Sequence, residues 1–193
     1  NATAPANLFT NTTYDVLDRP VSVANSLGAT SISYKGPETT TIDANNKQKK
    51  AKTDAYGNLI EVKEYNGANV YTTTYQYNEK NLLTKVTDAL GNIRNFTYNN
   101  IGWLTNSQDI RGSSDTTYGA SSFTYDLNGN QLVETQPNAV TVTRAYDMLD
   151  RPTSINGSNT TPVDYVLTYD TCTNGKGRVC TVTGTLPNST TLS

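Results

Sequence analysis

Cysteine is the residue type in this chain with the clearest chemistry, because two cysteines lie close together in the sequence. Cys172 and Cys180 flank residues 174–177, an Asn-Gly-Lys-Gly segment that is able to reverse the chain and bring two strand positions opposite one another. A disulfide is geometrically plausible across such a loop, and two free buried thiols are the alternative. If the bond forms, it indicates an oxidising, extracytoplasmic location.

Histidine is absent from the sequence. Its absence removes the commonest general base, the commonest metal ligand and any ordinary Ser-His or Cys-His pair. Two cysteines alone are too few for a zinc site. We therefore expect no catalytic residue, no cofactor site and no enzymatic activity.

One segment has the oxygen-bearing side chains with which a calcium loop begins. Asp126, Asn128 and Asn130 have this spacing, but Gln131 stands where an EF-hand loop needs glycine, and no bidentate Glu ends a twelve-residue loop. Asp and Asn also cap their own turns through side-chain to backbone hydrogen bonds. We favour the turn interpretation and expect no metal site.

The 13 tyrosines allow two interpretations. Their rings can stack on sugars, or they can pack against each other across neighbouring strands. Because tyrosine recurs at one register of a repeat, we favour cross-strand packing. A carbohydrate- or receptor-binding surface module remains an alternative function.

Composition favours an all-β protein and gives no electrostatic sign of a nucleic-acid or anionic-lipid ligand. Charged residues make up 17% of the chain and hydrophobic residues 35%, and Thr, Asn, Ser, Gly and Tyr are abundant. A net charge of -2 provides no basic surface for nucleic acid. The basic run 47–52 is interpreted as a solvated hairpin. No apolar stretch is long enough to span a membrane.

A repeat of about 21 residues organises most of the chain. Each copy begins with Tyr followed by Asp or Asn. These pairs are Tyr14-Asp15, Tyr77-Asn78, Tyr98-Asn99, Tyr125-Asp126, Tyr146-Asp147 and Tyr169-Asp170. Thr53-Asp54 fits the same frame without Tyr, and a degenerate copy is expected near Tyr34. The unit is therefore about two strands and two turns.

The turn chemistry supports this alignment. Four residues after the Tyr stands a residue that tolerates a left-handed backbone, as at Gly129 and Asp150. An insertion after Asp170 delays the last turn to Gly177 and Arg178. Second turns are predicted midway through several units, at 26–29, 88–92 and 156–157.

These patterns predict tandem antiparallel β-hairpins in a spiralling sheet, shell or fibre. We expect a lead-in over 1–13, the hairpin array over 14–184, and an extension over 185–193 that continues into further repeats. A hairpin cannot bury its apolar face alone, so neighbouring hairpins must pair edge to edge. The chain is interpreted as a mature protein or an excerpt of a longer one, with its targeting information elsewhere.

The chain resembles the RHS/YD-repeat family, most specifically in residues 87–92, 125–130 and 146–152, with 169–180 as a cysteine-bearing variant. The resemblance implies a sheet that spirals into a hollow shell, as in bacterial polymorphic toxins, insecticidal toxin complexes and teneurin-like surface proteins. It assigns structural roles to the repeat-motif residues. These are Tyr14, Asp15, Tyr77, Tyr98, Tyr125, Asp126, Gly129, Tyr146, Asp147, Arg151, Tyr169, Asp170, Gly177 and Arg178.

The expected function is a non-enzymatic structural scaffold, a segment of a secreted or cell-surface RHS-type shell or filament. Its partners would be further repeats of the same chain or identical subunits, joined by strand-edge pairing, with a glycan or cell-surface receptor as a further partner. A second alternative is a carrier segment of a polymorphic toxin whose effector lies outside this chain. Sequons occur at Asn11, Asn95, Asn156, Asn159 and Asn188 and matter only in a glycosylating source. No Asp-Pro dipeptide of the family's self-cleaving end is present.

Overall fold

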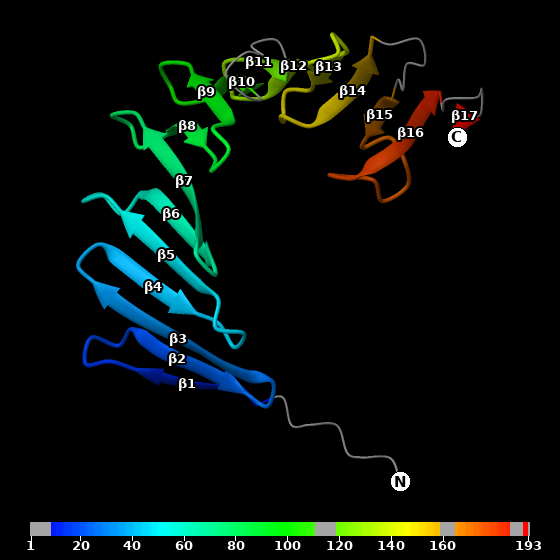
Figure 1. Cartoon of the computed structure of the whole chain (residues 1–193). Coiled ribbons are helices and arrows are strands. Elements are labelled where there is room, and N and C mark those ends of the chain that lie inside the picture. Colours follow the sequence, from blue (N-terminus) through cyan, green and yellow to red (C-terminus); the bar gives the residue numbers. More distant parts are fainter. Residues whose placement is uncertain (1–8, 111–118, 159–164, 186–190, 193) are drawn as a thin grey trace. The chain divides into compact units, whose positions relative to one another are not determined.

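A computed structural model describes residues 9–110, 119–158, 165–185 and 191–192 (Figure 1). All regular structure in these ranges is β, as the composition predicted. The strands are β1 (Asn11–Tyr14), β2 (Pro20–Asn25), β3 (Gly28–Lys35), β4 (Glu38–Ile42), β5 (Gln48–Thr53), β6 (Leu59–Asn66), β7 (Asn69–Tyr77), β8 (Leu83–Thr87), β9 (Ile93–Tyr98), β10 (Leu104–Ile110), β11 (Ala120–Tyr125), β12 (Gln131–Thr135), β13 (Thr141–Tyr146), β14 (Pro152–Gly157), β15 (Tyr165–Tyr169), β16 (Val179–Thr185) and β17 (Thr191–Leu192).

The chain divides into two compact units, Asn1–Ile93 and Arg94–Ser193. In the first unit, β1 to β8 pair in chain order, each strand antiparallel to the next. In the second, β9 pairs with β10, and β10 to β17 continue in the same antiparallel order. The predicted array of sequential antiparallel hairpins is confirmed.

A register shift marks the turn end of five tyrosine-type hairpins. The ladder slips by one residue just before Tyr14, Tyr77, Tyr125, Tyr146 and Tyr169. A bulge of this kind bends the strand and increases its twist. The extra residue lies on the strand after the turn, as Val21 does in β2. The Tyr itself stays paired, Tyr14 with Pro20 and Tyr77 with Leu83.

The two faces of the first unit differ in chemistry. Residues directly opposite one another share a face, and Val62 lies between Ala51 and Thr73 on the face that also carries Tyr75. On the other face Lys63 lies opposite Lys50. These two like charges are each neutralised by a glutamate: Nζ of Lys50 is 3.1 Å from Glu38, and Nζ of Lys63 is 2.9 Å from Glu61. The basic run lies in the hairpin of β4 and β5, most of it in strand β5, and three of its lysines are exposed, as the interpretation of a solvated hairpin predicted.

The sheet has almost no core of its own. Val62, at 6% exposure, is the only buried hydrophobic side chain among the described residues. Stability must therefore come mainly from strand pairing and from side-chain links between hairpins.

One turn prediction is wrong. Asn156 and Gly157 lie at the end of β14, where they pair with Thr143 and Val142 of β13. Pairing satisfies the backbone groups of this Asn-Gly dipeptide, so the local turn preference does not decide its conformation. By contrast, residues 26–27 connect β2 to β3 and residues 88–92 connect β8 to β9, as predicted.

Candidate functional site

The tyrosine-type turns have one hydrogen-bond pattern, in which the Asp or Asn after the Tyr position organises the loop. The Asp126 carboxylate accepts hydrogen bonds from the backbone N–H groups of Asn128 and Asn130, both at 2.9 Å. The backbone N–H of Asp126 donates to the carbonyl of Asn130, and Gly129 N–H donates to the carbonyl of Asp126. The same side-chain bonds recur at Asp15, Asp54, Asn78, Asn99 and Asp147.

The side chain four residues after the Asp also donates a hydrogen bond to the Asp carboxylate. Asn130 Nδ2 donates to Asp126 Oδ2 at 2.9 Å, and Arg151 Nε donates to Asp147 Oδ2 at 2.7 Å. These side-chain bonds, together with the backbone N–H groups, lower the pKa of both carboxyls below the usual range. Both carboxyl groups are therefore ionised near neutral pH. Their role is structural: as hydrogen-bond acceptors they stabilise the turns.

A left-handed residue closes each turn. Its φ is 94° at Gly129 and 59° at Asp150. Gly129 has a second reason to lack a side chain, because a Cβ atom there would lie 2.9 Å from the Trp103 ring. Trp103 also packs against Tyr125, with ring centroids 5.3 Å apart. Trp103 was not among the predicted structural residues, because no other repeat has Trp at the fourth position after the turn Asp or Asn.

The tyrosine hydroxyls connect successive hairpins. Each hydroxyl donates to a backbone carbonyl of the preceding hairpin, five residues after that hairpin's Asp or Asn, at 2.8 to 3.0 Å. The pairs are Tyr34 to Pro20, Tyr77 to Leu59, Tyr125 to Leu104, Tyr146 to Gln131 and Tyr169 to Pro152. We call each such bond a tyrosine latch. Tyr34 is the degenerate copy expected from the sequence.

Burial accompanies the latch. The pKa values of Tyr77, Tyr98 and Tyr125 are raised, chiefly because burial disfavours the phenolate. Tyr14, in the first hairpin, is 59% exposed. The hydroxyls of these half-buried rings therefore stay protonated and able to donate.

Two tyrosine rings pack on an arginine of the preceding turn. The Arg19 guanidinium lies 4.2 Å from the centroid of the Tyr34 ring, and the Arg151 guanidinium lies 4.2 Å from that of Tyr169. Both arginines also bind the aspartate of their own turn. In these two hairpins the ring thus packs on a turn residue, whereas packing of tyrosine on tyrosine was predicted.

Polar side chains link neighbouring turns along the same edge. Asn58 Nδ2 donates to Asn81 Oδ1 at 2.9 Å, and Asn130 Nδ2 donates to Asp150 Oδ1 at 2.6 Å. Arg151 Nη2 donates to Asp170 Oδ2 at 2.9 Å. The sequence signal for these links is an Asn or Arg four residues after the turn Asp, but only the sheet register identifies the partner.

Cys172 and Cys180 form a disulfide, with Cα atoms 5.4 Å apart. The bond closes the loop between β15 and β16, where Gly177 N–H donates to Asp170 Oδ1 at 2.6 Å. Arg178 N–H donates to the carbonyl of Gly175. A Cβ atom at Gly175 would lie 2.5 Å from Cys172 Sγ. The disulfide therefore requires glycine at the centre of the loop.

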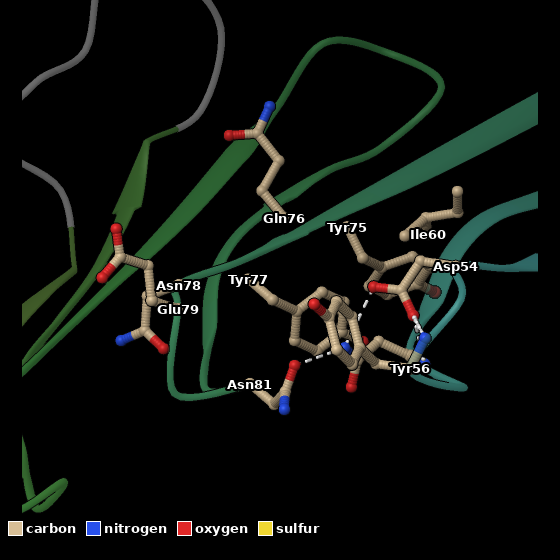
Figure 2. Close-up of a pocket in the computed structure, with 10 residues that line it drawn as sticks. Asp54, Tyr56, Ile60, Tyr75, Gln76, Tyr77, Asn78, Glu79 and Asn81 are labelled. Carbon is tan, nitrogen blue, oxygen red and sulfur yellow. Dashed lines mark hydrogen bonds between the residues drawn. The ribbon is translucent and has the colours of Figure 1, made fainter.

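An open hollow of about 660 Å³ lies beside two turns of the first unit (Figure 2). Tyr56, Tyr75 and Tyr77 contribute to its lining, together with Asp54, Asn58 and Asn81. Within the described ranges, no group of three acidic, cysteine or histidine side chains is placed to hold a metal ion. No helix there is long and apolar enough to cross a bilayer.

The repeated turns match a known family profile. Residues 54–93 and 77–117 match the RHS repeat in two overlapping copies. The chain carries RHS repeats. The resemblance seen in the sequence is confirmed, and these RHS repeats include the turns at Asp54, Asn78, Asp88 and Asn99.

Solved structures share the fold of these RHS repeats. The chain superimposes on the crystal structure of TcdB2-TccC3-Cdc42 with a TM-score of 0.59 and 17% identity over 92% of its length, and on TcdB2-TccC3 with 0.59 and 16% over 92%. A Photorhabdus luminescens Tc holotoxin pore matches with 0.58 and 17% over 91%. This chain spans only 11% to 12% of those chains. No curated protein matches the sequence.

Proposed function

We propose that this chain is a non-enzymatic structural segment of a secreted or cell-surface wall built from RHS repeats, in a shell or a filament. The observation that carries the proposal is the tyrosine latch, which ties each of several hairpins to the one before it. A latch between consecutive units lets a sheet grow by adding hairpins, without a globular core. Repeat proteins gain their stability in this way, from nearest-neighbour interfaces.

The proposed partners are further repeats or identical subunits that pair with free strand edges. Among the described strands, β1 pairs with β2 alone. An unpaired edge presents backbone N–H and C=O groups to another strand. The disulfide between Cys172 and Cys180 supports an extracytoplasmic location, because such bonds persist in oxidising compartments.

Edge pairing is tested with a matched pair of lysine substitutions in the full chain. Thr13→Lys places a charge on the edge strand β1, while Thr124→Lys places one at the corresponding position, just before Tyr125, in β11, which is flanked on both sides. We expect concentration-dependent association of the unmodified chain in multi-angle light scattering, weakened by Thr13→Lys and retained in Thr124→Lys. Equal behaviour of both variants would contradict pairing through β1.

The proposed role in the wall of a shell or filament is tested by cryo-electron imaging of the native material. Continuous fibres or hollow particles with walls of β-hairpins would support the scaffold. Discrete compact monomers, or a hydrolytic or transfer activity that purifies with the chain, would contradict it.

A toxin-carrier role is a second candidate, favoured by the structural match to TcdB2-TccC3 over most of the chain. Limited proteolysis of native particles distinguishes it from a bare scaffold. A segment of the parent protein that resists protease until the particle is opened would support a carrier. Uniform cleavage of all segments outside the repeats would favour the filament.

A further inference from the structure

The hollow beside the turns 54–58 and 78–82 combines aromatic rings with polar groups (Figure 2). Tyr56 stands at the tip of the first turn and is 82% exposed. Tyr75 and Tyr77 come from β7, the first strand of the next tyrosine-type hairpin. The hollow thus has rings from two elements that are distant in sequence but adjacent in the sheet.

The three tyrosines are not equivalent. The Tyr77 hydroxyl is used in a latch to the Leu59 carbonyl, 3.0 Å away. The hydroxyls of Tyr56 and Tyr75 have no hydrogen-bond partner in the part of the chain that the structure describes. Two phenol groups therefore remain available at the hollow, beside rings that offer an apolar face.

The position of Tyr56 is distinctive among the turns. The same position, two residues after the turn Asp or Asn, is exposed in the other turns but never aromatic. It holds Leu17, Ile101 and Leu149, and the polar Lys80 and Asn128. Tyr75 likewise takes a place, two residues before the hairpin Tyr, that is filled by Phe123 and Leu167 in later hairpins. Only here do both positions carry tyrosine, so the repeat's structural needs do not explain the pair.

The charges and amides around the rings define the ligand class. Asp54 and Glu79 contribute to the lining, and no Lys or Arg does. An anionic ligand would be repelled. The Asn58 and Asn81 side chains hydrogen bond to each other at 2.9 Å, which fixes amide groups at the rim. Fixed amides and phenols suit a ligand with many hydroxyl groups, and tyrosine rings stack on the apolar face of a pyranose.

We propose that the hollow formed by Tyr56, Tyr75, Asn58 and Asn81 is a binding subsite for a neutral oligosaccharide, with the Tyr56 and Tyr75 rings as stacking platforms. An open hollow of about 660 Å³ has room for two or more sugar units of a longer chain. This role goes beyond the structural scaffold: the repeats would hold a glycan at one point on the turn edge, and the latches would keep the platform rigid.

The test measures binding of the full chain to maltopentaose, cellopentaose, mannopentaose and N-acetylchitopentaose by isothermal titration and by NMR chemical shifts. We expect saturable binding of at least one sugar, with shift changes around residues 54–60 and 75–81. Tyr56→Leu, which installs the side chain already present at Leu17 and Leu149, should weaken binding about tenfold. Tyr75→Phe should weaken it by a smaller factor, since it removes only the hydroxyl.

Tyr71→Leu is the matched control. Tyr71 lies on the same strand and the same face as Tyr75 and is 46% exposed, but it does not contribute to the hollow. Its substitution should leave the affinity unchanged. Circular dichroism of each variant shows whether the sheet is intact.

Three results would overturn the sugar subsite: no saturable binding to any of the four sugars, equal loss in Tyr56→Leu and Tyr71→Leu, or binding of choline chloride in place of sugar. A choline result would indicate that the rings and carboxylates recognise a quaternary ammonium ion. None of these results affects the scaffold, which is tested by association and imaging.

Discussion

The phenolic hydroxyl of Tyr146 donates a hydrogen bond to the backbone carbonyl of Gln131, with the two oxygen atoms 3.0 Å apart. Tyr146 ends β13 and Gln131 begins β12, so this bond joins a tyrosine-type turn to the one before it. It belongs to the set of latches that replaces a conventional core in this sheet.

Removing this hydroxyl tests the latch directly. Tyr146→Phe keeps the ring but loses the hydrogen bond, and should lower the free energy of unfolding by about 0.5 to 1.5 kcal/mol. Urea unfolding followed by circular dichroism measures the change. Tyr71→Phe, at an exposed position outside the latches, is the control and should have no effect. An equal change in both variants would show that the latch contributes nothing.

Acid should weaken the turns. Because Asp126 and Asp147 have pKa values below the ordinary 3.8, their contribution is fully present above that value and is lost as the pH falls through the lowered ones. We expect the melting temperature to fall between about pH 4 and about pH 2 and to stay nearly constant from about pH 6 to about pH 5.

Asp126→Asn identifies the source of this acid sensitivity. Asn already occupies the same turn position at Asn78 and Asn99, where its Oδ1 accepts the backbone bonds. The variant should fold and should lose less stability than the unmodified chain on acidification. An unchanged acid profile would assign the loss to other carboxylates.

Two turn glycines should differ in their tolerance of a methyl group. Gly57→Ala meets only the strain of positive φ, since no atom lies within 4 Å of the new Cβ. Gly129→Ala meets the same kind of strain and also the Trp103 ring at 2.9 Å. We expect a loss of about 1 kcal/mol for Gly57→Ala and a further 1 to 3 kcal/mol, roughly, for Gly129→Ala. Chemical unfolding compares them, and equal losses would exclude a contribution from the tryptophan contact.

The disulfide should stabilise the last described tyrosine-type hairpin. The Cys172→Ser, Cys180→Ser double variant should lose about 2 to 3 kcal/mol in the chain-entropy model, because the bond restricts a short loop in the unfolded chain. Hydrogen exchange should report the loss mainly in β15 and β16. The unmodified chain in dithiothreitol is the control and should behave like the variant. Unaltered exchange in β15 and β16 in both samples would show that the hydrogen bonds of Asp170 suffice to hold the loop.

Much of the fold could be predicted because the hairpin is encoded locally. Asp126 and Asn130 are four residues apart and meet through bonds that any isolated turn could form. The wrong turn at Asn156-Gly157 shows the limit of this reasoning. There, pairing with β13 satisfied the backbone, and strand geometry prevailed over a local preference.

The sequence by itself determined the repeating unit, the positions of the tyrosine-type turns and the proximity of Cys172 and Cys180, since these depend on residues close together in the chain. Only the tertiary structure decided where each tyrosine hydroxyl is directed, which turn side chains meet, and that Tyr56 and Tyr75 share a hollow. Those contacts join residues of different hairpins. Their partners are set by the bulges and the strand register, which no short stretch of sequence specifies.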